Sequence, residues 1–153
     1  MNNPALQQEK KAIDQLIDQI GSFSGDPFIA SQLTYYLCIR ISGFIETCVR
    51  TIFMEYCSPR IRDNVSNFID VQLRRSRNPS YESICNLTKE FDKEWVQTFK
   101  AAVTVQNRDA LQSINVNRNN IAHGETSNIT LRQLTDYYDE AIDLLNKLEK
   151  TCV

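Results

Sequence analysis

Residues 28–56 constrain the fold of this chain more than any other stretch. Their apolar side chains recur every three or four residues, which is the spacing of one face of an α-helix. These side chains are Leu33, Leu37, Ile41, Phe44, Ile45, Cys48, Ile52, Phe53 and Tyr56. The pattern predicts one long helix, and only four glycines and four prolines occur in the whole chain, which is few for an all-β protein.

The rest of the chain shows the same helical spacing, so we expect an all-α bundle of about six to seven helices. The expected helices cover residues 4–20, 28–56, 61–77, 81–91, 93–103, 107–123 and 130–150. Thr130 and Gln133 match a capping box at the start of the last helix, and Gly124 is a natural residue just past the end of the one before it. We expect residues 1–153 to form a single domain.

Composition narrows the class of protein. The formal net charge is −2, so no basic field covers the whole domain and any nucleic-acid contact needs a local patch. The cysteines number five, with no Cys-x-x-Cys pair, which favours buried free thiols over disulfides or a zinc site. No signal-peptide core and no apolar run of membrane length is present in this sequence. We therefore expect a cytoplasmic protein without membrane association.

Two charged clusters have both a structural and a functional interpretation. Arg74, Arg75 and Arg77 lie at the expected end of a helix, where cations suit the helix dipole, or they contact phosphates. Glu46 lies four residues before Arg50 on the long helix, an arrangement that favours an ion pair on a solvated face.

Residues 118–124, with the sequence RNNIAHG, contain the only histidine. Arg118 takes a position on an apolar stripe where an aliphatic residue is expected, and a charge there needs a partner or access to solvent. Either the helix emerges from the core at this point, or Arg118 is paired, for instance with Glu46. A preorganised arginine for phosphate binding fits the position as well as a structural pair does.

Asn119 and His123 are four residues apart, so their side chains share one face of the helix and Asn119 could orient the imidazole. The helix C-terminus favours a protonated imidazole, whereas the nearby Arg118 opposes it, and this balance suits acid–base chemistry. A histidine that only caps the helix is the structural alternative.

Arg118 and His123 do not lie above one another on the helix. Five residues correspond to about 140° of rotation and roughly 7.5 Å of rise, so one copy places both groups awkwardly around one phosphate. Two copies related by a two-fold axis could build one cleft from two arginines and two histidines. If the segment is catalytic, the geometry favours a homodimer.

The string from Arg118 to His123 resembles the hallmark of the HEPN superfamily (higher eukaryotes and prokaryotes nucleotide-binding). That hallmark is an arginine followed, after four to six residues, by a histidine, with a polar residue commonly next to the arginine. The chain is similar to stand-alone bacterial proteins of the RiboL-PSP-HEPN type, a likeness carried by residues 43–46, 91–95 and 119–124 on a similar helical layout.

The resemblance implies a metal-independent endoribonuclease with its active site at a homodimer interface and with no cofactor. It implies His123 as general acid or base, Arg118 as the group that stabilises the phosphorane, Asn119 as a positioning residue and Glu46 as a supporting one. It also implies an RNA substrate and a toxin–antitoxin or phage-defence setting with a partner protein. The alternatives are a non-catalytic HEPN-fold module for dimerisation, nucleotide binding or protein interaction, and an unrelated helical adaptor.

Overall fold

A computed structural model describes residues 1–75 and 77–152, and every regular element in these ranges is helical. The elements are α1 (Pro4–Gly21), α2 (Pro27–Cys57), the 3₁₀ turn η1 (Ser58–Arg60), α3 (Asp63–Leu73), α4 (Tyr81–Phe91), α5 (Lys93–Ala102), α6 (Val105–Ala122) and α7 (Leu131–Thr151). The expected all-α bundle with one long helix is confirmed.

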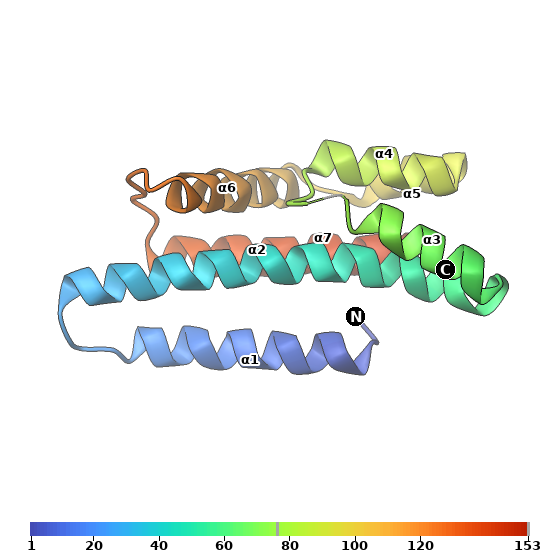
Figure 1. The fold of residues 1–153 in the computed structure, drawn as a ribbon. Coiled ribbons are helices and arrows are strands. Elements are labelled where there is room, and N and C mark those ends of the chain that lie inside the picture. The colour runs from blue at the N-terminus through green and yellow to red at the C-terminus, as the bar shows by residue number, and fades with distance from the viewer. Residues whose placement is uncertain (76, 153) are drawn as a thin grey trace.

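Helix α2 is the axis on which the others pack. Figure 1 shows α1 along one side of α2 and α6 along the other, with α7 behind and α3 to α5 gathered toward the C-terminal end of α2. Asp26 caps α2, where its side chain accepts a hydrogen bond from the Phe28 amide, and Pro27 occupies the first turn. The predicted start of the helix is therefore correct to within one residue.

One continuous apolar core holds the bundle together. The largest fully buried side chains include Phe44 and Phe53 from α2, Phe99 from α5 and Tyr138 from α7. All five cysteines are free and buried, as the sequence predicted. Burial raises the pKa of the Cys38 thiol to about 11, with the nearby charge of Arg118 opposing the shift. None of the described helices is long and apolar enough to cross a membrane.

The expected helix over residues 61–77 is shorter than the sequence suggested. Ser58 to Arg60 form a separate 3₁₀ turn, and α3 ends at Leu73. Asn78 has a φ of 48°, in the left-handed region, and turns the chain immediately before Pro79. All three arginines therefore follow the helix, and the helix-dipole interpretation applies only to Arg74, its C-cap residue, and to the adjacent Arg75.

Candidate functional site

The N-terminal end of α6 is fixed to α7 through a buried asparagine. Thr104 and Asn107 form a capping box, and the Asn107 side chain is fully buried. Its amide nitrogen donates to a Glu140 carboxylate oxygen at 2.7 Å, and its carbonyl oxygen accepts from Lys147 Nζ at 2.7 Å. Lys147 also pairs with Asp143 at 2.5 Å. This network fixes where α6 begins, and so where its other end lies.

The C-terminal end of α6 closes in a Schellman motif. The His123 N–H donates to the Asn119 carbonyl at 3.0 Å, the Gly124 N–H to the Ile121 carbonyl at 3.2 Å, and the Glu125 N–H to the Asn120 carbonyl at 2.8 Å. Gly124 has a φ of 71°, which a residue with a side chain rarely adopts. His123 is the C-cap residue, and its side chain is exposed to solvent.

Arg118 emerges from the edge of the core beside α2. It is half-buried, and its Nη1 donates to the Asn119 side-chain oxygen at 3.2 Å. Of the two expectations for Arg118, emergence from the core therefore describes the structure. The suggested pair with Glu46 does not form, because Glu46 accepts a hydrogen bond from the Asn78 N–H at 3.2 Å instead.

Arg118, Asn119 and His123 all lie on the last turns of α6, and Asn119 and His123 are exposed. Asn119 uses its side-chain oxygen for Arg118 rather than for the imidazole. Among the described residues, the His123 side chain makes no hydrogen bond within the chain. Asn119 and His123 are therefore open to solvent, with Arg118 half-buried beside Asn119, and a ligand or a second protein surface can reach this end of α6.

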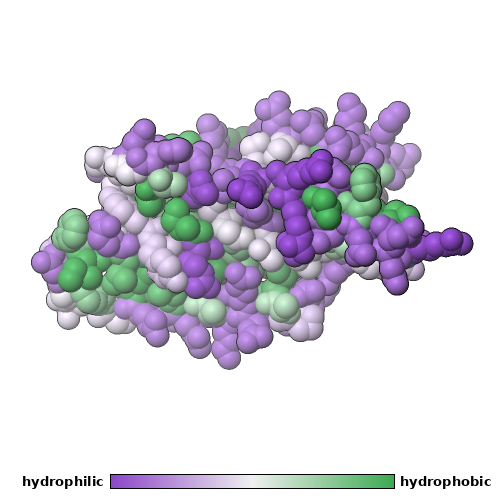
Figure 2. Space-filling view, in the orientation of Figure 1, coloured by the Kyte–Doolittle hydropathy of each residue, from purple (hydrophilic) through white to green (hydrophobic). Residues whose placement is uncertain are grey.

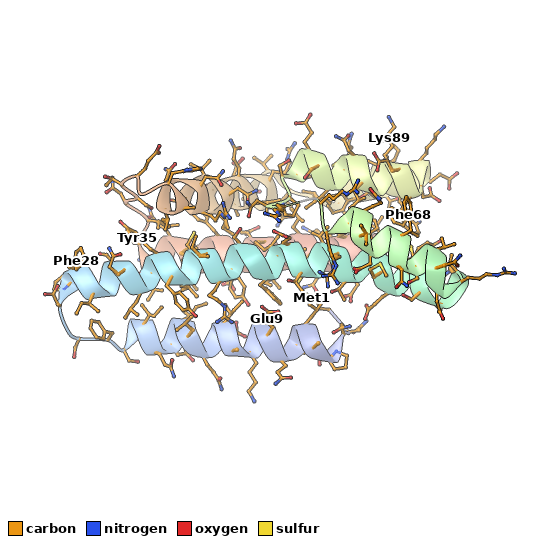
Figure 3. All side chains as sticks on the ribbon, viewed as in Figure 1. Met1, Glu9, Phe28, Tyr35, Phe68 and Lys89 are labelled. Carbon is orange, nitrogen blue, oxygen red and sulfur yellow. The ribbon has the colours of Figure 1, made fainter. Side chains whose placement is uncertain are left out.

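The loop that follows His123 is tied to two helices. The Tyr35 hydroxyl donates to the Ser127 carbonyl, and Figure 3 shows Tyr35 on the side of α2 that faces α6. The Ser127 hydroxyl donates to Asn117 Oδ1 at 2.7 Å. Ser127 is buried, although it belongs to a loop. Sequence reasoning missed this connection, because its members come from three separate elements and share no motif.

Glu46 belongs to a different surface from Arg118. On α2, Cys38 contacts α6 through the Ile114 carbonyl. Glu46 comes eight residues later, which is about 12 Å further along α2. There it lines a hollow of about 360 Å³ together with Arg50, Arg74 and Arg77. The structure thus brings Glu46 together with two of the three predicted RNA-binding arginines, and not with Arg118 and His123 of the same chain.

The arginines at this hollow differ in how they are neutralised. Asp70 pairs with Arg50 at 3.3 Å and with Arg74 at 2.8 Å, so one carboxylate serves two guanidinium groups. Arg75 lies outside this hollow and lines a neighbouring one, where it donates to the neutral Gln72 side chain at 3.0 Å. The Glu46 to Arg50 ion pair expected from the sequence is replaced by the contact with Asp70.

A second feature that sequence reasoning missed is a groove of about 500 Å³ that starts at Asn119 and follows α6 toward its N-terminus. Its walls come from α6 and from the start of α4. The spacing of the α6 amides, at residues 112, 115 and 119, is visible in the sequence, but the contribution of α4 is not. Within the described residues, no group of three or more His, Cys, Asp and Glu side chains is placed to hold a metal ion.

Comparison with known families gives one match. Residues 5–153 match the family described as RiboL-PSP-HEPN, which covers nearly the whole chain. The chain therefore belongs to this family of the HEPN superfamily. A search of curated proteins found no match. A search of solved structures found none either.

Proposed function

We propose that the protein is a metal-independent endoribonuclease whose active site contains Arg118, Asn119 and His123. One observation carries the proposal: the last turns of α6 hold all three residues, with Arg118 half-buried at the edge of the core and Asn119 and His123 exposed, in a chain of the HEPN superfamily. A histidine whose side chain served only to cap the helix would be expected to bond to the chain, and the imidazole makes no such hydrogen bond among the described residues.

The proposed reaction uses the RNA itself as the nucleophile. The ribose 2′-hydroxyl loses its proton to a base and attacks the adjacent phosphorus, and the bond to the 5′-oxygen of the next nucleotide breaks. The products are a 2′,3′-cyclic phosphate and a 5′-hydroxyl. His123 transfers a proton at one of these oxygens, and Arg118 stabilises the negative charge of the phosphorane. Asn119 holds the Arg118 guanidinium in place through their 3.2 Å hydrogen bond.

The complete site is proposed to form between two copies of the chain. Arg118 and His123 differ by five residues, and so by about 140° around α6, which separates them in one protomer. Beside Arg118, α2 exposes an apolar flank on which Ile29, Tyr36 and Ile39 are 48%, 50% and 37% accessible. Figure 2 shows apolar side chains in green at the end of the molecule where α2 begins. Pairing along this flank would bring two α6 ends together.

The environment of Gly43 also favours this flank of α2 as the dimer contact. It is exposed on α2, and no atom lies within 4 Å of the position that a Cβ would take. A second helix could therefore approach the backbone closely at this point. We expect Gly43→Arg to shift the protein from dimer to monomer in sedimentation experiments, while Lys11→Ala on the exposed side of α1 leaves the dimer intact.

The arginine hollow is proposed as a secondary contact for the RNA backbone. Arg77 contributes to it more than Arg74, whose charge is offset by Asp70. Glu46 is proposed to support this surface by holding the Asn78 backbone, and with it the turn that carries Arg77. The setting we propose is cytoplasmic, in a toxin–antitoxin or phage-defence system with a partner protein that restrains the nuclease.

The test of catalysis is cleavage of labelled RNA in EDTA. We expect the wild-type protein and a Thr126→Ala control, changed in the same exposed loop, to leave 2′,3′-cyclic phosphate ends, and His123→Ala to leave intact RNA. Cleavage that persists in His123→Ala would disprove the role of the histidine. A well-folded dimer without any cleavage would instead favour the non-catalytic HEPN-fold module.

The test of a shared site uses mixed dimers. Protomers carrying Arg118→Ala are mixed and refolded with protomers carrying His123→Ala, each inactive alone. If one chain supplies the arginine and the other the histidine, mixed dimers contain one intact pair and recover part of the activity. If mixed dimers form but remain inactive, the two residues act within one chain or all four are required.

A further inference from the structure

The groove between α4 and α6 begins at the proposed active site. Asn119 belongs to both, because it lines the groove and accepts the hydrogen bond from Arg118. From Asn119 the groove passes Asn115, Gln112 and Arg108, which is 11 residues along α6 and about 16 Å. Its volume of about 500 Å³ lies in the range of small-molecule sites, about 300 to 1,000 Å³.

The charges of the groove do not suit a phosphate. Glu82 and Asp109 line it with carboxylates, against the single guanidinium of Arg108. That guanidinium lies over the Tyr81 ring, 5.5 Å from its centroid. A negatively charged group placed inside the groove would be repelled, whereas a neutral planar group could stack on this arginine–tyrosine pair.

The polar groups of the groove are of the kind that read base edges. Gln112, Asn115 and Asn119 present side-chain amides at helical spacing along one wall. Asn115 uses its nitrogen on the Pro79 carbonyl at 3.2 Å and keeps its oxygen as an acceptor, whereas Asn119 uses its oxygen and keeps its nitrogen as a donor. Gln112 makes no side-chain hydrogen bond among the described residues. Paired donors and acceptors match the edge of a nucleobase.

Apolar surface completes the groove. Val105 and Val116, which are 55% and 49% accessible, lie along its length. Exposed branched side chains in a groove lined by amides suit the faces of a planar ring, because stacking removes apolar surface from water. The dimer contact proposed along α2 leaves this groove open, since the groove runs away from the end of α6.

We propose that this groove binds an unpaired RNA base next to the cleaved phosphate and gives the nuclease a base preference at that position. This inference rests on the proposed function for its substrate class. Phosphate binding stays with Arg118, and base selection is assigned to Gln112, Asn115 and the Arg108–Tyr81 stack.

The experiment reads the base preference directly. A pool of single-stranded RNA with random sequence is cleaved by the wild type, by Gln112→Ala and by Arg108→Gln, and the bases flanking each cut are sequenced. Gln106→Ala is the matched control, because Gln106 is exposed on α6 and does not line the groove. We expect one flanking position to show a preference that weakens at least about fivefold in both groove variants and persists in the control.

Cleavage without any base preference, or a preference that Gln112→Ala and Arg108→Gln leave unchanged, would overturn the inference. A separate arm measures binding by fluorescence anisotropy, using hexaribonucleotides of each single base and the His123→Ala protein, which keeps the groove. Binding that discriminates between the bases and is weakened by Gln112→Ala supports the groove even if the wild type proves not to cleave RNA. Equal binding of all four, or binding indifferent to Gln112→Ala, counts against it while leaving the nuclease proposal intact.

Discussion

The two ends of α6 differ in almost every physical respect. At the N-terminal end, Asn107 is fully buried and its side chain joins α6 to Glu140 and Lys147 of α7. At the C-terminal end, His123 and Gly124 are exposed, and the closing hydrogen bonds are all between backbone groups of the same helix. One end is built to hold the helix in place, whereas the other leaves its side chains free to act on a ligand.

The comparison teaches that stability and function are separated along one helix of 18 residues. A buried polar side chain that meets several partners must stay where it is, because an unsatisfied group in the core is costly. Substitution of an exposed histidine changes the free energy of unfolding little. Substitutions at the two ends should therefore affect different measurements.

The largest expected effect is on catalysis. His123→Ala should lower the rate of RNA cleavage by roughly 10²- to 10⁴-fold, the usual contribution of a positioned acid or base. Its free energy of unfolding should change by less than about 0.5 kcal/mol, since the side chain is exposed. Single-turnover kinetics and urea denaturation measure the two quantities. A large loss of stability with unchanged cleavage would reverse the assignment of this end.

The opposite result is expected at Asn107. Asn107→Ala should lower the free energy of unfolding by about 2 to 3 kcal/mol. The reason is that the side-chain hydrogen bonds of Asn107 to Glu140 and Lys147 are lost, while Glu140 and Lys147 stay partly buried. Cleavage measured well below the melting temperature should remain within a few-fold of wild type. Asn128→Ala, an exposed asparagine in the α6–α7 loop, is the control. A change below about 0.5 kcal/mol would show that the buried network contributes little.

A pair of glycines sharpens the comparison at the level of the backbone. No atom lies within 4 Å of an added Cβ at Gly124 or at Gly43, so steric contacts are equal. Gly124→Ala should destabilise the protein by about 1 kcal/mol, because a φ of 71° disfavours any side chain. Gly43→Ala, inside α2, should stabilise the single chain by about 0.5 to 1 kcal/mol when both variants are compared at concentrations too low for dimers. Equal effects in thermal unfolding would mean that Gly124 is not held in the left-handed conformation.

The smallest effect concerns Cys38, which packs against the middle of α6. Its folded pKa is raised by burial to about 11, whereas the unfolded thiol has its ordinary value of 9.0. Between these values the unfolded chain releases a proton that the folded chain keeps, so stability is full below pH 9 and falls as the pH rises toward 11. Unfolding midpoints at pH 8 and 10 should differ less in Cys38→Ala than in wild type. An identical dependence would show that the thiol titrates alike in both states.

Much of the fold could be predicted because the spacing of apolar residues along the chain indicates directly which segments are helical. The long helix, the α4 range and the capping box at Thr130 were all correct. The prediction failed over residues 61–77, where a 3₁₀ turn precedes α3 and the left-handed Asn78 ends the segment. Periodicity does not reveal such turns, because they are stabilised by contacts with α2 rather than by their own sequence.

The candidate site also has some features that the sequence predicted and others that it did not. The spacing of Arg118, Asn119 and His123, and the role of Gly124 in ending the helix, could be read from seven consecutive residues. The separation of Glu46 from Arg118 could not, because it depends on how α2 and α6 pack against each other and not on either sequence alone. The arginines were recognised as a cluster, but not the carboxylate of Asp70 that neutralises Arg74.

The sequence by itself determined the helices, their ends outside the segment around α3, and the residues at the end of α6, since all of these depend on neighbours within a few positions. Only the tertiary structure decided which groups meet across elements. It joined Asn107 to α7, tied Ser127 to Tyr35, and opened a groove between α4 and α6. The physical reason is that helical periodicity fixes which face of each helix is buried, whereas packing against α2 fixes how far each helix slides along it.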